Sequence, residues 1–297
     1  MVLSAVWFAI TYLFVKLCTG KFPFFLFTFS RFLIPCLILL IVLFTQKCFQ
    51  DCFRVKRFHT HILRAIFVTI TQFSIFYYLS KGSLLNGTVL LNTGPLFIPL
   101  IEWLLIGHKL GKSTLVSLIV AFTGVILILQ PGTDLFSYLS LVGLLAGFTQ
   151  ACSQVLYGIH VREQKVVVNL FLLFFLCSCI SLLPLLVSYF VFSYQTTQYS
   201  LLFTSKEWYL LLFLFILASA NVLTQFYRGQ AYSKGGRPAT LASFLYLAVL
   251  FAAFFDWLIF DLTPNIFSIL GTILVIGSVI IKITMRRHIL KKRAQTK

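Results

Sequence analysis

Phe76–Leu129, FYYLSKGSLLNGTVLLNTGPLFIPLIEWLLIGHKLGKSTLVSLIVAFTGVILIL, recurs in altered form about half a chain later as Tyr227–Ile281. The triplet Thr71-Gln72-Phe73 just before it matches Thr224-Gln225-Phe226 just before its copy, at an offset of 153 residues. Both copies are almost wholly apolar. The chain therefore contains an internal repeat, and the repeat decides how the rest of the sequence is interpreted.

The offset changes slightly within the repeat. Glu102-Trp103 matches Asp256-Trp257 at 154 residues, which one inserted residue near Arg237-Pro238 explains. Each half holds five predicted membrane spans. Because five is odd, the second half should lie upside down in the bilayer relative to the first. Inverted repeats are typical of secondary transporters, which place the substrate near the midplane between the halves.

Composition places the chain in a membrane. Of its 297 residues, 60% are hydrophobic and 10% charged, and the mean hydropathy is +0.98. Apolar runs of about 17–25 residues match the length of a helix that crosses a bilayer. Because the runs are continuous and do not alternate, we expect helices and not a barrel. The predicted spans are Leu3–Cys18, Phe24–Thr45, Ala65–Leu79, Leu84–Gly107, Ser113–Leu129, Tyr138–Val161, Val166–Tyr194, Trp208–Arg228, Pro238–Phe260 and Ile266–Lys282.

The predicted fold is thus an all-α integral membrane protein of about ten transmembrane helices in two inverted five-helix repeats. We assign the first repeat to residues 1–134 and the second to residues 135–284. A basic tail follows at residues 285–297.

The net charge of +17 is explained by topology. With the amino terminus in the cytoplasm, 19 of the 24 Lys and Arg residues lie in inner loops, at inner span ends or in the tail. This bias predicts a multi-pass membrane protein with both termini cytoplasmic, its basic loops against membrane lipids. We expect no nucleic-acid partner, since no soluble domain presents the charge. Four basic residues fall on the outer side: Lys16, Lys21, Lys81 and Lys206.

No motif for catalysis or cofactor binding stands up. Gly111-Lys112-Ser113 ends like a phosphate-binding loop, but Ile106 occupies the position of the required first glycine. His59 and His61 have no carboxylate cluster beside them, so we expect no metal site. We find no nucleophile–base set either. The sequence predicts a protein that is not an enzyme and needs no cofactor.

Several short motifs resemble drug/metabolite transporters of the EamA type. They are the opening Trp7-Phe8-Ala9-Ile10 with Lys16, then Arg31-Phe32-Leu33, Phe76-Tyr77-Tyr78-Leu79, Pro95 and Gly124-Val125. The resemblance covers nearly the whole chain and implies a carrier of small molecules.

The chain departs from that family at two places. The family usually has a Gly-Glu pair after its fourth span, where this chain has Gly107-His108. The proline that would match Pro95 in the second half is replaced near Ala248-Val249. Within the family, the run from Arg64 through Tyr77-Tyr78 to Leu129-Gln130-Pro131-Gly132 looks most like S-adenosylmethionine carriers of bacteria that live inside host cells.

Polar side chains within spans are the candidate substrate ligands, because such groups are expensive in a bilayer. Several lie three or four residues apart and so share one helical face, as in Gln150 and Gln154. The alternative is hydrogen bonding between packed helices. The candidates for substrate binding are Trp7, Gln72, Asn92, Gln150, Gln154, Asn221, Gln225 and Tyr246.

Charged residues near the two mouths suggest gates. Glu102 lies near the inner end of its span, and Asp256 is its repeat equivalent near the outer end. We hypothesise that Arg31 or Lys16 pairs with Asp256 when the outside is closed. Arg228 or Arg162 would pair with Glu102 when the inside is closed, with a static ion pair or a proton-carrying role as alternatives. The candidate gating or coupling charges are Lys16, Arg31, Glu102, Arg162, Arg228 and Asp256.

The sequence predicts a secondary active metabolite transporter that works by alternating access. The favoured cargo is S-adenosylmethionine, taken up in exchange for S-adenosylhomocysteine, or a related small metabolite. An amino-acid or drug exporter of the same family is the alternative. A channel or a non-transporting membrane scaffold stays open as another class, and so do direction, coupling and oligomeric state.

Overall fold

A computed structural model describes residues 1–18, 21–55, 57–81, 84–107, 111–130, 138–191, 208–260 and 266–295. Within these ranges the secondary structure is helical throughout. The elements are α1 (Val2–Cys18), α2 (Phe24–Thr45), η1 (Phe49–Phe53), α3 (Phe58–Lys81), α4 (Leu84–Leu91), α5 (Gly94–Ile106), α6 (Lys112–Leu129), α7 (Ser140–His160), α8 (Val166–Val191), α10 (Trp208–Ser233), α11 (Pro238–Leu241), η5 (Ala242–Tyr246), α12 (Leu247–Phe260) and α13 (Ile266–Gln295).

The predicted fold class is confirmed: the chain is an all-α, multi-pass membrane protein. Seven segments of the described residues are long and apolar enough to cross a bilayer, and three shorter apolar helices fall where the first, fifth and tenth spans were predicted. Ten spans fit this arrangement. Two helices extend furthest beyond their predicted bounds: α3 begins at Phe58, seven residues before the predicted Ala65, and α13 continues to Gln295, thirteen residues past the predicted Lys282 and into the predicted tail.

Two spans are discontinuous, and they are the fourth and the ninth. The first break separates α4 from α5 at Asn92-Thr93. Pro95 explains it, because proline has no N–H to donate to the preceding turn. The second break is the 3₁₀ segment η5, which ends at Tyr246, the residue that the repeat aligns with Asn92. Corresponding spans of the two halves are therefore interrupted at corresponding positions, although only the first has a proline there.

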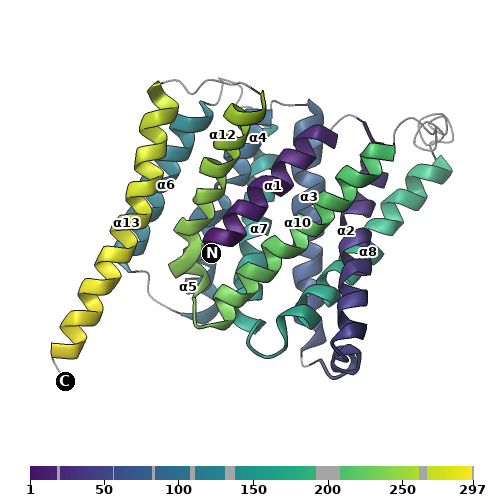
Figure 1. Cartoon of the computed structure of the whole chain (residues 1–297), viewed down its shortest axis with the longest axis horizontal. Coiled ribbons are helices and arrows are strands. Elements are labelled where there is room, and N and C mark those ends of the chain that lie inside the picture. The colour runs from purple at the N-terminus through teal and green to yellow at the C-terminus, as the bar shows by residue number, and fades with distance from the viewer. Residues whose placement is uncertain are drawn as a thin grey trace.

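Helix packing pairs the halves. The closest pairs are α1 with α10, α2 with α8, α3 with α7 and α6 with α13 (Figure 1). By span order, the repeat would make α1 equivalent to α7, and α3 equivalent to α10. The α3–α7 and α10–α1 pairs would then be equivalent contacts, whereas α2–α8 and α6–α13 would each join two equivalent helices. The division of the chain into two repeats and their inverted orientation in the bilayer stay predictions.

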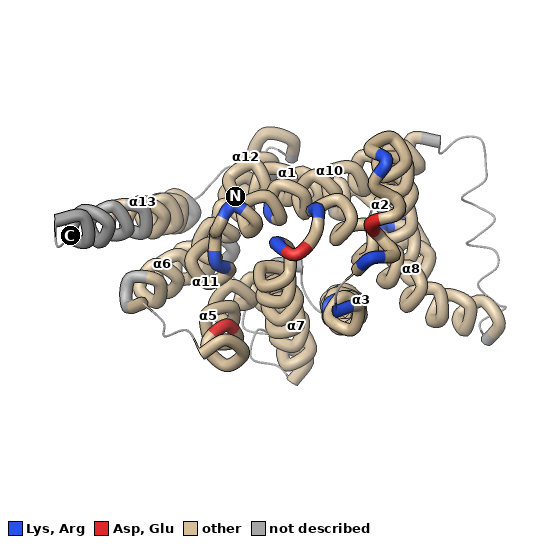
Figure 2. Tube along the Cα trace, turned by 90° about the horizontal axis from the view of Figure 1, so that it is seen from below, with Lys and Arg blue, Asp and Glu red and all other residues tan. Residues whose placement is uncertain are grey.

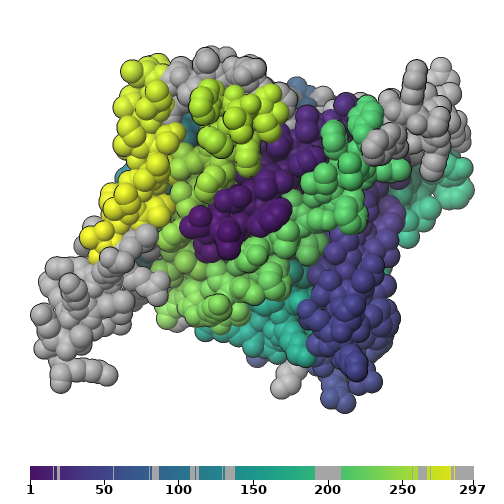
Figure 3. Space-filling model, viewed as in Figure 1, coloured from purple at the N-terminus to yellow at the C-terminus, as the bar shows by residue number. Residues whose placement is uncertain are grey.

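The outward faces are apolar, as lipid contact demands. Large side chains are exposed all along the bundle, among them Leu183 at 67% and Ile273 at 60%. Figure 3 shows one such face, with α1 packed into a continuous surface together with α10 and α12. In a soluble protein so much exposed apolar area would be an interaction site or an aggregation hazard. Here it marks the belt of the molecule that meets hydrocarbon.

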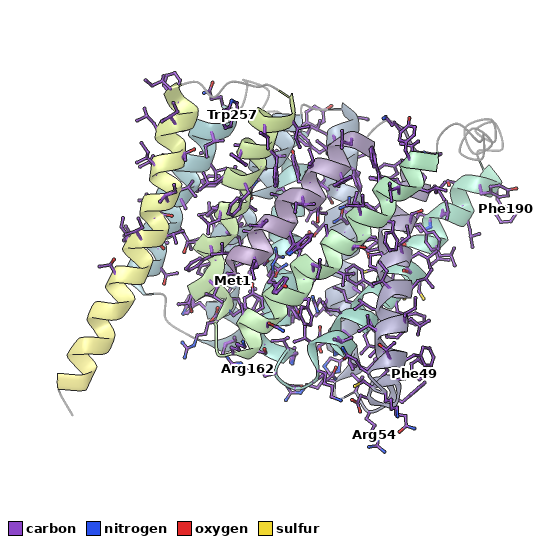
Figure 4. All side chains as sticks on the ribbon, in the orientation of Figure 1. Met1, Phe49, Arg54, Arg162, Phe190 and Trp257 are labelled. Carbon is purple, nitrogen blue, oxygen red and sulfur yellow. The ribbon has the colours of Figure 1, made fainter. Side chains whose placement is uncertain are left out.

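Charged residues gather at one end of the bundle. Seen from that end, Lys and Arg dot the loops and helix tips (Figure 2). Arg54 and Arg162 lie at this end, whereas Trp257 lies at the other (Figure 4). The loops are tied together by ion pairs, with Lys165 Nζ 3.0 Å from Asp51 Oδ2 and Arg57 Nη1 3.4 Å from Glu163 Oε1. This end matches the side that the charge bias assigns to the cytoplasm.

Glycines allow the tightest helix contact, between α6 and α13. A Cβ atom on Gly124 would lie 2.7 Å from the Gly271 carbonyl oxygen, and one on Gly271 would lie 2.5 Å from the Gly124 oxygen. Side chains cannot be accommodated at such distances, so the two backbones touch only because both residues are glycine. Gly277, the repeat equivalent of Gly124, has open space at its Cβ position.

Candidate substrate site

A cavity lies in the centre of the bundle, next to the break between α4 and α5. It consists of two neighbouring pockets, here called its lobes, and Phe8 and Gln150 line both. The larger lobe, of about 110 Å³, lies among α1, α2, α3, α4 and α7. The smaller, of about 30 Å³, lies among α1, α5, α7, α10 and η5. Side chains from both predicted repeats therefore surround one space, as in a transporter site at a repeat interface.

The break between α4 and α5 shapes one wall. Asn92, the last residue before α5, lines the smaller lobe, and its Nδ2 donates a 2.8 Å hydrogen bond to the carbonyl oxygen of Thr88. Gly94 and Pro95, in the first turn of α5, line the same lobe. This turn packs closely on α7: a Cβ on Gly147 would lie 2.5 Å from Thr93 Oγ1. A small residue on α7 thus keeps the broken helix in place.

Three other amide side chains face the cavity. Gln150 lines both lobes, and Gln154, one turn further along α7, lines the smaller. Gln154 is buried and accepts a 3.5 Å hydrogen bond from the hydroxyl of Tyr232. Gln72 of α3 lines the larger lobe. These four predicted ligands, including Asn92, are brought together by the fold.

Two arginines also line the cavity, one in each lobe. Arg31 Nη1 donates a 3.3 Å hydrogen bond to Gln72 Oε1, and its guanidinium lies 5.3 Å from the Phe76 ring centroid. Arg228 of α10 faces the smaller lobe and is only 5% exposed. Its Nε is buried without a hydrogen-bond partner, and its guanidinium lies 5.9 Å from the Phe8 ring.

The other predicted ligands lie elsewhere. Trp7 and Asn221 are half-buried and line neither lobe. Tyr246 is fully buried in an apolar cluster, 6.3 Å from the Phe122 ring, and its hydroxyl has no partner. Gln225 lies beside Tyr157, whose hydroxyl donates to the Gln225 backbone oxygen at 3.1 Å; its own side-chain Oε1 is buried without a partner.

The candidate gate at Glu102 has a different partner from the hypothesised one. Glu102 is 3% exposed, and its Oε2 accepts a 2.7 Å hydrogen bond from the backbone N–H of Ala239, in the short helix α11. Arg162 is exposed and donates from Nε to the carbonyl oxygen of Tyr232 at 3.3 Å. In the described part of the chain, neither Arg162 nor Arg228 lies within ion-pair distance of Glu102.

The outer gate cannot be located in the same way. The side chains of Lys16 and Asp256 lie outside the described residues, so the pairing of Asp256 with Arg31 or Lys16 stays a prediction.

Sequence reasoning missed one wall, the face of α1 that carries Phe8, Thr11, Tyr12 and Val15. These residues recur at helical spacing, so the stripe was visible. Because α1 is mostly apolar, its polar residues did not stand out, and Trp7, a residue predicted to bind substrate, is the neighbour of Phe8 and does not line the cavity. Thr71, Thr88 and Phe76 complete the larger lobe.

Comparison with known proteins supports the resemblance. Residues 1–130 match the model of the EamA-like transporter family. The S-adenosylmethionine uptake transporter of Rickettsia felis is 23% identical over 268 residues, covering 90% of this chain and 85% of that protein. The pseudopaline exporter of Pseudomonas aeruginosa strain UCBPP-PA14 is 23% identical over 218 residues, covering 72% and 71%.

A solved crystal structure shares the fold, with a TM-score of 0.74 at 18% identity over 95% of this chain and 96% of the other. The resemblance to EamA-type drug/metabolite transporters that the sequence predicted is therefore confirmed. The match to the EamA-like transporter family covers residues 1–130, which supply α1 to α6 and most of the larger lobe.

Proposed function

We propose that the protein is a secondary metabolite carrier that moves S-adenosylmethionine across the bacterial inner membrane by alternating access. One observation carries the proposal: a two-lobed central cavity, lined by amides, arginines and aromatic rings, lies beside a broken helix. Discontinuous helices at corresponding positions of two halves mark the substrate site in many transporters. The similarity to an uptake transporter for this compound supports the choice of cargo.

The cavity offers groups suited to each part of that molecule. Phe8, Tyr12 and Phe76 provide aromatic faces in the larger lobe for a purine ring. Gln150 and Gln154 provide amide donors and acceptors for an amino-acid end. The cargo would then span both lobes, with its ring beside α1 and its amino-acid end beside α5.

The contact between Glu102 and Ala239 is our candidate for the closed inner gate. It joins α5 to α11, and so links the two discontinuous spans near the end that carries the basic loops. The repeat offset of 154 gives its counterpart: Asp256 would accept from the backbone N–H of Leu85, the second residue of α4. In this proposal the two carboxylate–amide contacts form alternately, each closing one side.

The membrane orientation belongs to the same proposal. Both termini would be cytoplasmic, and residues 1–134 and 135–284 would form the two inverted repeats. The clustering of Lys and Arg at one end of the bundle supports this topology.

The test is uptake of labelled S-adenosylmethionine into liposomes that contain the purified protein. Saturable uptake, accelerated by preloading the liposomes with S-adenosylhomocysteine, is the expected result, because an exchanger returns faster when loaded. Protein-free liposomes and a folded Gln150→Ala variant serve as controls, and the variant should raise KM at least tenfold. Uptake equal to that of protein-free liposomes would reject this cargo.

An exporter of amino acids or drugs is the second candidate. The similarity to the pseudopaline exporter favours it. So do the two arginines that line the cavity, because their positive charges would repel the sulfonium cation of S-adenosylmethionine. Efflux from loaded liposomes of a labelled amino-acid panel, without uptake of S-adenosylmethionine, would favour the exporter.

A further inference from the structure

Arg228 stands apart from the other buried arginines. Arg64, 3% exposed, donates to Asn169 Oδ1 and lies 3.7 Å from the Tyr157 ring centroid. Arg31 donates to Gln72. Arg228 makes no hydrogen bond to any residue that the structure describes, and its Nε is buried. A guanidinium has five N–H donors, so this one lacks the partners that buried cations need.

The described acids are engaged elsewhere. Glu102 accepts from Ala239, Asp51 pairs with Lys165, and Glu163 pairs with Arg57 and His160. Of the acids whose side chains the structure describes, none neutralises Arg228. An unpaired buried charge is strongly unfavourable unless a ligand completes it.

Arg228 faces the cavity together with groups that also favour an anion. The first turn of α5, a helix of 13 residues, lines the same lobe through Gly94 and Pro95. A helix N-terminus carries partial positive charge, and half-helix N-termini point at anionic substrate groups in broken-helix transporters. Gln150 and Gln154 add amide N–H donors from α7.

The size of this lobe selects the group. At about 30 Å³ it has room for roughly two water-sized groups, which matches a carboxylate. We propose that the smaller lobe is a carboxylate-binding subsite, in which Arg228 binds the carboxylate of the cargo while the larger lobe holds its aromatic or apolar remainder. The cargo class is therefore metabolites with an α-amino-acid end. This inference rests on the proposed carrier function and adds to it the chemistry of recognition.

The first test needs no cargo. Thermal unfolding of the purified protein without ligand should shift upward in Arg228→Met, by roughly 3 °C or more, because an uncompensated buried charge is replaced by an apolar chain of similar length. Arg64→Met is the matched control: it removes a buried arginine that has partners, so its midpoint should fall. A lower midpoint in Arg228→Met would assign Arg228 a structural role and overturn the proposal.

The second test compares ligands that differ only in the carboxylate. S-adenosylmethionine and its decarboxylated form should compete for uptake into wild-type liposomes with at least a tenfold difference in inhibition constant. In Arg228→Gln the two should inhibit equally, and Arg228→Lys should recover part of the difference. Arg54→Gln, at an exposed loop position, should keep the wild-type preference. Equal inhibition of the wild type by both compounds would overturn the proposal.

A wrong cargo can be told apart from a wrong subsite. If wild-type liposomes take up no S-adenosylmethionine, the cargo fails, and the subsite is tested by thermal shift with L-phenylalanine and phenethylamine at equal concentration. Stabilisation by phenylalanine alone, lost in Arg228→Gln, supports the subsite. If phenylalanine stabilises the wild type and Arg228→Gln equally, the subsite is rejected. It is also rejected if phenylalanine stabilises neither protein and the thermal midpoint of Arg228→Met is lowered.

Discussion

Glu102 accepts a hydrogen bond from a backbone N–H instead of pairing with an arginine, so its contact with α11 is a hydrogen bond and not an ion pair. The sequence showed an acid near a span end and suggested an arginine partner. Which group meets it depends on how α11 turns after Pro238, and that turn could not be derived from the repeat. The same limit applies to the cavity: spacing put Gln150 and Gln154 on one stripe, but only packing decides which stripes face the cavity. Gln225, spaced just as well, turns its side chain elsewhere.

Substituting Glu102 tests the proposed inner gate, the contact between Glu102 and Ala239, directly. Glu102→Ala leaves the Ala239 N–H without its acceptor, so we expect a loss of about 1–3 kcal/mol in stability and a leakier transporter. Glu102→Gln keeps an acceptor oxygen and should lose less. The measurements are the thermal midpoint and cargo efflux from loaded liposomes.

The opposite ranking would indicate another role. If Glu102→Gln abolishes a pH dependence of uptake while the thermal midpoint of the variant stays at the wild-type value, the carboxylate carries a proton and does not close the inner gate.

At the scale of elements, the sequence predicted which segments cross the membrane but not where they break. Ten apolar runs are visible because hydropathy is summed over whole spans. The interruption at Asn92-Thr93 leaves hydropathy unchanged, although Pro95 marked it. The matching interruption at η5 has no proline and was invisible. Glycine contacts such as Gly124–Gly271 were also hidden, because the repeat pairs Gly124 with Gly277 by alignment and not by contact.

The contact between α7 and the first broken span can be probed at Gly147. Its Cβ would lie 2.5 Å from Thr93 Oγ1 and 2.8 Å from the Leu90 carbonyl oxygen, so Gly147→Val must displace the break. We expect at least a tenfold fall in uptake with a lower midpoint. Gly111→Ala is the control, because its Cβ would meet only Thr114 at 3.8 Å.

The α6–α13 contact gives a second prediction. Gly124→Leu should separate the two helices and lower the thermal midpoint, since its side chain would collide with the Gly271 backbone. Gly277→Leu, on the same helix pair but facing open space, should leave the free energy of unfolding within about 0.5 kcal/mol of the wild-type value. Equal effects of the two substitutions would contradict this account.

For the whole molecule, the positive-inside bias predicts topology, and a native cysteine can test it. Cys52 lies in η1, in the loop region at the basic end, whereas Cys48 beside it is buried. A membrane-impermeant maleimide should label Cys52 in inside-out vesicles but not in intact cells, and Cys52→Ser is the control.

The rate of labelling should depend on pH in a definite direction. Partial burial, together with the charge of Asp51, raises the pKa of the Cys52 thiol. Because the thiolate is the nucleophile, less of it is present at neutral pH than in a free cysteine. Labelling should therefore accelerate as the pH rises from 7 to 9. Labelling of intact cells at any pH would place this loop outside.

The bare guanidinium of Arg228 has a consequence for the timing of transport. An empty carrier that closes must strip water from a cation with nothing to replace it, whereas a loaded carrier closes over a neutralised pair. In the proposed transport cycle, the return of the empty form would then be the slow step, and a second cargo molecule on the far side would remove the barrier. In the proposed carrier, one-for-one exchange would follow from a single unpaired side chain: each cargo molecule that enters would be matched by one that leaves, so the cell would trade one metabolite for another without spending an ion gradient.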